Sequence, residues 1–378
     1  MTENLFKKLY DYSCSDIYPF CMPGHKRRFS AEYSLDPYRI DITEVDGFDD
    51  LQKCTGILGD IQNDLCAVYG CANVFMSVNG SSACNLAAIW AMPENGRIAV
   101  ASNCHRSVFN ALKINRRKGI FIDPAAMPSG LKGGISPEEV NSLLNEYPDI
   151  CAVAVTSPTY EGFVSDVNAL ANVCHSHGAL LIVDEAHGAH LPFCSSPSFP
   201  LSAICQGADI VIESLHKTLP ALNQTSLIFV PNDDVLAKKV KECLNMVMTT
   251  SPSYILMASV QEAVMWSHLH REEFDRYAHR ITALRQDLST LEKIHLVDNS
   301  VAGNYNILGI DPGKLVFAPD TGKSALNGKA LFTLLQKRYS LALEKYEDGF
   351  ALAMTSVMDS EEGLRRLADA IFDIEKSL

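Results

Sequence analysis

The chain has 378 residues, 47% of them apolar, which is enough for a substantial core divided between more than one domain. Its 32 basic and 45 acidic residues give a net charge of −13 at pH 7. A chain this acidic is poorly suited to nucleic acid or to an anionic membrane surface, which argues against both as partners.

Cysteine usage and hydropathy indicate the compartment. The twelve cysteines include no CxxC pair, which is typical of free thiols in a reducing cytosol. The first residues show no apolar leader segment, and no stretch approaches the ~20 apolar residues that cross a bilayer. We therefore expect a soluble, cytoplasmic protein.

Three regions follow one another along the chain. Residues 1–60 are rich in turns and charge, and we expect them to form an N-terminal arm that takes part in a dimer. Between residues 61 and 290, apolar runs alternate with helical patterns, which predicts a large domain with a mostly parallel sheet. The strand candidates are Arg97–Ala101, Gly119–Ile122, Cys151–Val155, Ala179–Val183, Asp209–Ile212 and Ser226–Val230.

The last part of the chain predicts a second, smaller domain. Apolar residues recur near helical spacing from about Pro252 to Leu291, which indicates one long helix. Beyond it, residues 291–378 carry short strand-like segments and helices near Ala325–Arg338 and Glu361–Lys376. The complete pattern predicts an α/β protein with a small C-terminal α+β domain.

Two residues just past apolar runs suggest a pyridoxal phosphate site. Lys217 follows the run Asp209–Ile212, and Asp184 follows Leu180–Val183. In α/β sheets, ligands bind at such strand ends. A lysine amine forms a Schiff base with the cofactor aldehyde, and a carboxylate keeps the pyridine nitrogen protonated. We expect partial burial to lower the pKa of Lys217 so that its amine can react.

A turn earlier in the chain is a candidate for the cofactor phosphate. In Asn79-Gly-Ser-Ser-Ala83, Gly80 permits close backbone approach, and Ser81 and Ser82 open a predicted helix. Backbone N–H groups and the helix dipole favour an anion there. Ser82 alone could simply cap the helix, but together with Lys217 the phosphate interpretation is favoured.

Eight sequence blocks in the same order resemble the ornithine/lysine/arginine decarboxylases of the aspartate-aminotransferase-like fold, and the similarity runs over nearly the whole chain. This resemblance implies the fold of pyridoxal-phosphate-dependent transferases, known as fold type I. Eight ordered blocks are far more specific than one His-Lys pair. They are Pro23–Lys26, Asp41–Leu51, Asn79–Ser82, Asn103–Ser107, Thr156–Gly162, Asp184–His187, Ser214–Lys217 and Thr249–Tyr254.

The resemblance also implies roles for further residues. It places Ser81, Ser82, Ser214 and His216 near the cofactor phosphate or the lysine. It implies that His105 stacks on the pyridine ring, although spacing alone favours a helix-start histidine bonded to a carbonyl. It implies that His187 reaches the ring oxygen. The resulting catalytic set is Lys217, Asp184, His105 and His216.

A metal site is a minor alternative for part of this set. Asp184, His187 and His190 have a spacing that is chemically plausible for ligands. That interpretation leaves Lys217 without a role, so we predict no bound metal.

The resemblance further implies an active site shared between subunits. Thr250 and Ser251 would contact the phosphate of the neighbouring subunit, so a homodimer or higher homo-oligomer is expected, although an ordinary capping turn also explains this segment. Glu44 and Asp46 would line the substrate entrance from the partner chain. Glu344 matches a glutamate position suited to the distal cation of a basic substrate, and a surface glutamate is the alternative.

The implied reaction is decarboxylation of arginine, lysine or ornithine to the corresponding amine and CO2, with Lys217 or His216 protonating Cα. An aminotransferase or other Cα chemistry on the same fold remains open, and so does a non-decarboxylating relative with a regulatory role. Within this family, the chain resembles the short form, which has no receiver-like N-terminal domain. It also ends at Leu378 without the usual further C-terminal domain, and Arg27-Arg28 stand near the place of a family glycine.

Overall fold

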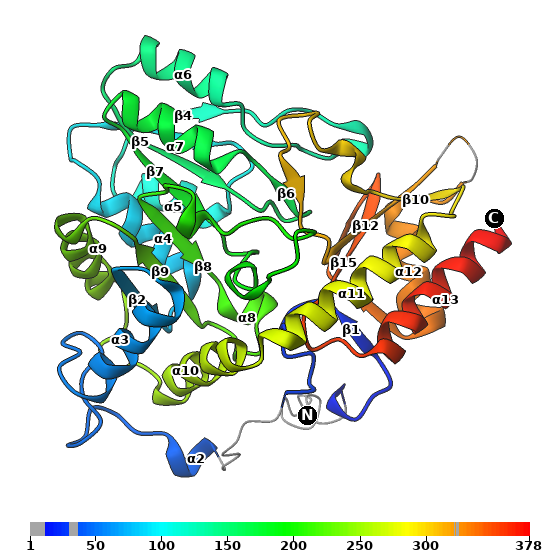
Figure 1. Cartoon of the computed structure of the whole chain (residues 1–378), viewed down its shortest axis with the longest axis horizontal. Coiled ribbons are helices and arrows are strands. Elements are labelled where there is room, and N and C mark those ends of the chain that lie inside the picture. Colours follow the sequence, from blue (N-terminus) through cyan, green and yellow to red (C-terminus); the bar gives the residue numbers. More distant parts are fainter. Residues whose placement is uncertain (1–11, 30–36, 321, 323–324) are drawn as a thin grey trace, which may run out of the picture.

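The structure is a computed structural model that describes residues 12–29, 37–320, 322 and 325–378 (Figure 1). Parts of the predicted N-terminal arm, residues 1–11 and 30–36, lie outside the described residues. Across the described ranges, no helix combines the length and the apolar character needed to cross a membrane.

A seven-stranded sheet forms the centre of the large domain. Its strands contain mostly buried apolar side chains, and the sheet is parallel except for β9, which runs antiparallel to both of its neighbours. All six predicted strands are confirmed, and β2 is an addition. In sheet order the strands are β2 (Asn73–Ser77), β9 (Ser226–Val230), β8 (Ile210–Glu213), β7 (Leu180–Asp184), β5 (Ile150–Thr156), β3 (Arg97–Ala101) and β4 (Gly119–Ile122).

Helices connect and cover these strands. One of them, α4, packs against both α5 and α9, while α6 packs against α7, and α3 packs against α10 (Figure 1). Their bounds are α2 (Pro37–Ile40), α3 (Ile57–Tyr69), α4 (Gly80–Ala91), α5 (Arg106–Ile114), α6 (Pro137–Glu146), α7 (Val167–Ser176), α8 (Leu215–Thr218), α9 (Asp234–Val247) and α10 (Tyr254–Leu269).

The single long helix predicted from Pro252 to Leu291 is wrong, because α10 ends at Leu269 and α11 (Arg271–Leu288) begins after His270. His270 leaves the helical conformation, with φ −121° and ψ 46°. Its ring nitrogen Nδ1 lies 2.9 Å from the Trp266 carbonyl oxygen, and its ring stacks on the Trp266 indole with centroids 5.0 Å apart. These local contacts stabilise the break.

The small domain is built on a four-stranded antiparallel sheet with strand order β10-β12-β15-β14. Helix α12 packs on this sheet, and α13 packs along α11, so both predicted C-terminal helices are confirmed. The elements are β10 (Ile294–Leu296), β12 (Lys314–Pro319), α12 (Gly328–Tyr339), β13 (Leu341–Leu343), β14 (Lys345–Glu347), β15 (Phe350–Met354) and α13 (Glu361–Ser377).

Two short strand pairs tie distant segments together. The N-terminal β1 (Tyr18–Phe20) pairs in parallel with β13, so this part of the predicted arm joins the small domain. Strand β6 (Phe163–Val164) of the large domain pairs with β11 (Gly309–Ile310), which precedes β12. A small apolar cluster that includes Phe163 and Ile310 packs around this second pair.

Candidate active site

Asp184 and Lys217 meet where neighbouring parallel strands end. Strand β7 ends at Asp184, which is in register with Ile212 of β8. Lys217 lies on α8, the single helical turn that follows β8, and its Nζ is 3.0 Å from His187 Nε2. The structure therefore brings Asp184, His187 and Lys217 together at one edge of the sheet.

Burial controls the charge of this group. It is the main cause that lowers the pKa of Lys217; Lys314 acts in the same direction, and the carboxylates of Asp184 and Glu344 oppose both. Burial also holds the pKa of His187 well below its usual range. His187 is therefore neutral. We expect its Nε2 to accept from the lysine amine, which would place its proton on Nδ1. That buried Nδ1 has no hydrogen-bond partner among the described residues.

Asp184 is surrounded by donors. Its side chain is 3% exposed, its Oδ1 accepts from the Ala186 N–H at 3.1 Å, and its Oδ2 accepts from Asn85 Nδ2 at 3.0 Å. Donors of this kind stabilise the ionised form of a carboxyl group. Asp184 is therefore suited to face a cationic ring nitrogen.

His105 caps α5 and also lies near Asp184. Its Nδ1 accepts from the Ser107 N–H at 3.3 Å and lies 2.8 Å from Ser107 Oγ. The expected helix-start contact is thus made to an N–H and a hydroxyl, not to a carbonyl. Burial lowers the pKa of His105, so its ring is neutral. Asn85 was not singled out from the sequence because an asparagine within a helix carries no motif of its own, and Ser107 belongs to the block Asn103–Ser107 but had no role assigned.

The predicted phosphate turn opens α4. Gly80 has φ 72°, which favours glycine, and Asn79 at the N-cap makes no side-chain capping bond to the first turn. Ser81 accepts a hydrogen bond from Ser214 Oγ at 2.8 Å. Ser82 is exposed inside the first turn, so it is not the helix cap. An N-terminus without a side-chain cap leaves N–H groups for an anion.

Two other predicted sites lie in different surroundings. Thr250 and Ser251 are exposed, and the preceding Thr249 N–H donates to Asn79 Oδ1 at 3.3 Å, beside the phosphate turn of the same chain. His216 is half-buried, with Nδ1 3.0 Å from the Thr225 carbonyl oxygen. Since a carbonyl only accepts, His216 Nδ1 carries the proton.

Glu344 lies close to the lysine, whereas the acidic residues of the N-terminal loop are exposed. Glu344 accepts from the Met22 N–H at 2.9 Å and from the Tyr160 hydroxyl, and the Tyr160 ring lies 4.4 Å from that of His187. Tyr160 belongs to the block Thr156–Gly162 but had no role assigned. Glu44 and Asp46 are exposed on the segment between α2 and α3.

Lys314, Asp311 and His190 form a buried charged cluster next to His187 that was not predicted from the sequence. Lys314 Nζ is 3.5 Å from Asp311 Oδ2 and 3.4 Å from the His187 carbonyl oxygen. Asp311 Oδ1 lies 3.4 Å from His190 Nε2. His187 and His190 thus have different partners, and no group of three metal-ligating side chains occurs within the described ranges.

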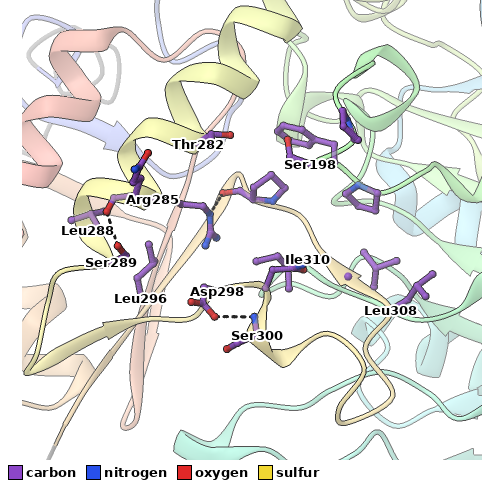
Figure 2. A pocket seen from close by; sticks show the side chains of 18 of the residues that line it. Ser198, Thr282, Arg285, Leu288, Ser289, Leu296, Asp298, Ser300, Leu308 and Ile310 are labelled. Atoms are coloured by element: carbon purple, nitrogen blue, oxygen red, sulfur yellow. Dashed lines mark hydrogen bonds between the residues drawn. The ribbon is translucent and has the colours of Figure 1, made fainter.

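Two surface pockets differ in their relation to this site. A pocket of about 760 Å³ lies between α11 and β11 (Figure 2) and contains none of the predicted site residues. Its Arg285 guanidinium already donates to the carbonyl oxygens of Pro312, Val297 and Lys314. A second pocket, of about 660 Å³, is lined in part by Asn103 and by Tyr160, whose ring packs against that of His187.

The donor set fits pyridoxal phosphate. Lys217 offers a buried amine, Asp184 a carboxylate rich in donors, and the start of α4 an anion-binding turn. His187 Nδ1 is a buried donor that has no partner among the described residues, so it is available to a ligand oxygen.

Comparison with known proteins agrees with this arrangement. Residues 3–314 match the family model of the Orn/Lys/Arg decarboxylase major domain. The chain is 32% identical to the uncharacterized protein YaaO of Bacillus subtilis over 351 residues, 89% of this chain and 70% of that protein. It is 28% identical to the arginine decarboxylase of Halalkalibacterium halodurans over 381 residues, 98% of this chain and 76% of that protein.

Solved structures share the fold at low sequence identity. The lysine decarboxylase LdcF of Francisella novicida superposes with a TM-score of 0.77 at 18% identity, and the match covers 98% of this chain but 59% of that chain. The pyridoxamine-pyruvate aminotransferase of Mesorhizobium loti gives a TM-score of 0.67 at 14% identity, and the match covers 96% of this chain and 93% of that chain. The chain belongs to the Orn/Lys/Arg decarboxylase family and has the fold of the pyridoxal-phosphate-dependent fold type I enzymes.

Proposed function

We propose that this protein catalyses pyridoxal-phosphate-dependent decarboxylation of a basic amino acid, arginine, lysine or ornithine, to the corresponding amine and CO2. The observation that carries the proposal is the buried Lys217 amine, 3.0 Å from neutral His187, at the strand ends that also present Asp184. Relatives named arginine decarboxylase and lysine decarboxylase support the reaction type.

The described side chains would hold the cofactor as follows. Lys217 would bind it covalently, Asp184 would pair with the pyridine nitrogen, and His105 would cover the ring. His187 Nδ1 would donate to the ring oxygen, since this buried N–H has no other acceptor. The phosphate would be bound by the turn and by the hydroxyl pair; the residues are Gly80, Ser81, Ser82 and Ser214.

When bound, the cofactor supplies an electron-accepting ring next to the substrate Cα. The chain itself moves the protons. The 3.0 Å contact with His187 Nε2 holds the Lys217 amine in place. Lys217 would be the group that donates a proton to Cα. In the neutral His216 ring, Nδ1 carries the proton that is donated to the Thr225 carbonyl oxygen, so Nε2 has no proton to give to Cα. We therefore propose that His216 positions α8.

Substrate recognition would use acidic side chains. The Glu344 carboxylate is close enough to act electrostatically on Lys217 and is proposed to attract the distal cation of the substrate. Glu44 and Asp46 are proposed to reach the entrance from the partner subunit of a homodimer or larger homo-oligomer, whose Thr250 and Ser251 would contact the phosphate. A cytoplasmic location completes the proposal.

A spectroscopic and gas-release experiment tests the proposal. Purified wild-type protein should show the visible absorbance band of a lysine-bound cofactor, and Lys217→Ala should lose both the band and turnover. Arginine, lysine and ornithine are then added separately while released CO2 is trapped, and one of them should give gas. Lys238→Ala is the matched control, because Lys238 is exposed on α9.

The outcomes separate the parts of the proposal. A visible band without CO2 from any of the three amino acids would contradict decarboxylation of a basic substrate and leave the cofactor site standing. A protein that shows no band after cofactor is added would overturn the site itself.

A further inference from the structure

Four polar side chains form a continuous chain of hydrogen bonds beneath the proposed cofactor site. Asn85 Nδ2, on α4, lies 3.0 Å from Asp184 Oδ2 and 3.0 Å from Ser107 Oγ. Ser107 Oγ lies 2.8 Å from His105 Nδ1. Asn85 is 2% exposed and Ser107 is 4% exposed, so water does not compete for these contacts.

The chemistry of the groups fixes the direction of every bond. An ionised carboxylate only accepts, so the Asn85 amide must present its NH2 group and not its oxygen to Asp184. The second amide proton then points at Ser107 Oγ. Because Ser107 Oγ accepts from Asn85, its own proton is free to be donated to His105.

At the other end of this hydrogen-bond network, the contacts of His105 determine its tautomer. Its Nδ1 is approached by two donors, the Ser107 hydroxyl and the Ser107 backbone N–H. A ring nitrogen with two donors must carry a lone pair, so the neutral imidazole holds its proton on Nε2. These contacts also fix the plane of the ring. Charges that face it come from three elements: Asp184 of β7, Lys217 of α8 and Arg106 of α5.

Helix α4 gives this arrangement a further consequence. The same helix starts with the phosphate turn at Gly80–Ser82 and carries Asn85 one turn later. A single rigid element therefore sets the distance between the proposed phosphate site and the carboxylate that faces the ring nitrogen. Positions on helices are more precise than positions on loops.

We propose that Asn85 and Ser107 are positioning residues: Asn85 orients the Asp184 carboxyl group, and Ser107 holds His105 as the Nε2–H tautomer with a fixed ring plane. The inference rests on the proposed function, because it concerns the same cofactor site. Neither residue contacts the substrate in this scheme. Each acts through the side chain that it orients.

The test is site-resolved labelling of His105 with diethyl pyrocarbonate, which reacts with unprotonated imidazole. The full-length protein, with no cofactor added, is labelled over a range of pH, and the His105 peptide is quantified by mass spectrometry. A donor to Nδ1 favours the neutral ring, so removing it should raise the pKa of His105. On the acidic side of the profile, Ser107→Ala should be labelled about two- to tenfold more slowly than wild type.

Two further variants keep the test decisive. Ser107→Cys retains volume but provides a weak donor, so its labelling rate should lie between those of wild type and Ser107→Ala. Ser267→Ala is the matched control: Ser267 is a buried helical serine that donates to the Ala263 carbonyl of α10, and its loss should leave the His105 profile unchanged. Asn85→Ala should lower the fraction of protein that retains added cofactor.

The result can be distinguished from failure of the proposed function. Labelling needs neither cofactor nor substrate, so the profile can shift whether or not the protein releases CO2. A His105 profile that is the same in wild type, Ser107→Cys and Ser107→Ala would overturn the inference. An equal shift in Ser267→Ala would also overturn it, because the effect would then be a general loss of packing.

Discussion

Two buried carboxyl side chains lie next to the site at the ends of adjacent strands. Glu185 follows Asp184 and accepts hydrogen bonds from Ser202 Oγ at 2.6 Å and from the Ala203 N–H at 2.9 Å. Glu213 ends β8, and the buried Tyr69 hydroxyl acts on its carboxyl group, although the two do not meet hydrogen-bond geometry. Burial raises the pKa of Glu185 to about 8 and that of Glu213 well above its usual range. Since Glu185 has donors that favour its charge, we expect the proton to stay on Glu213.

This proton makes stability depend on pH. A carboxyl whose folded pKa is raised contributes its stability below the unfolded value and loses it as pH rises toward the folded value. Wild-type protein should therefore lose stability as pH rises above the usual pKa of a glutamate, 4.5. Glu213→Gln removes the ionisation and should raise the free energy of unfolding near pH 8 relative to wild type, with little change near pH 5. Urea unfolding at both pH values measures the difference.

Glu185→Gln is the companion variant for this prediction. A glutamine side chain accepts at one oxygen only, so either Ser202 or Ala203 loses its acceptor. This variant should be destabilised by about 1–3 kcal/mol at both pH values. Equal pH profiles for wild type and Glu213→Gln would place the proton elsewhere.

Glu344 gives a second prediction for a single residue. Glu344→Gln removes the negative charge but can still accept from the Met22 N–H or the Tyr160 hydroxyl. If Glu344 attracts the distal cation, KM for the basic amino acid should rise roughly 10- to 100-fold with a smaller change in kcat. Steady-state kinetics measure both, with Glu347→Gln, an exposed neighbour on β14, as control. An unchanged KM would assign Glu344 to the structural contacts alone.

At the scale of elements, the position of Lys217 depends on a turn near the N-terminus. Helix α8 is one turn long, and the Gly24 N–H donates to its His216 carbonyl oxygen at 2.8 Å. Two residues later, buried Lys26 anchors the turn through Nζ, which donates to the carbonyl oxygens of Pro19, Cys21 and Met354. The Pro23–Lys26 block is therefore a support for the lysine helix.

The close approach explains why glycine occupies position 24. A Cβ there would lie 2.8 Å from the Leu219 carbonyl oxygen and 2.9 Å from the Thr218 carbonyl carbon, both backbone atoms that cannot give way cheaply. Gly24→Ala should lower the free energy of unfolding by about 1–3 kcal/mol and displace α8, which reduces cofactor retention. Gly309→Ala, where a Cβ meets nothing within 4 Å, should change stability by less than about 0.5 kcal/mol. Urea unfolding and bound-cofactor absorbance measure both effects, and equal values for the two variants would contradict this role.

At the scale of the whole molecule, the site receives side chains from both the seven-stranded sheet and the C-terminal four-stranded sheet. Strand β6 of the large domain pairs with β11, and Lys314 of β12 reaches the His187 carbonyl oxygen. The small domain therefore contributes to the electrostatics of Lys217.

The proposed shared site predicts complementation between inactive chains. Lys217→Ala and the double variant Thr250→Ala/Ser251→Ala should each have low activity, and mixing them under conditions of subunit exchange should restore about a quarter of wild-type activity. One site in each mixed dimer then has an intact Lys217 from one chain and an intact Thr250–Ser251 segment from the other. CO2 release by the mixture measures the gain. Activity no higher than the average of the two separate variants would mean that the segment acts within its own chain, next to Asn79.

Particular elements show how far the sequence could be interpreted. Five of the six predicted strands are largely buried apolar runs, which is the pattern of a parallel sheet covered on both faces, whereas β4 at the sheet edge exposes Phe121. The antiparallel direction of β9 could not be predicted, because an apolar run carries no information about the direction of a strand in its sheet. The break at His270 has no proline or glycine signal and depends on contacts with Trp266.

Local composition and motif order along the chain predicted six strands, the candidate lysine with its carboxylate, the candidate phosphate turn and the family. The side chains that surround these residues could be identified only in the folded structure. Examples are Asn85 and Ser107 on two helices, Glu213 beside Tyr69, and the Lys314–Asp311 pair, which are brought together by packing between distant segments. Burial and hydrogen-bond partners are properties of the folded arrangement, so residue order along the chain does not specify them.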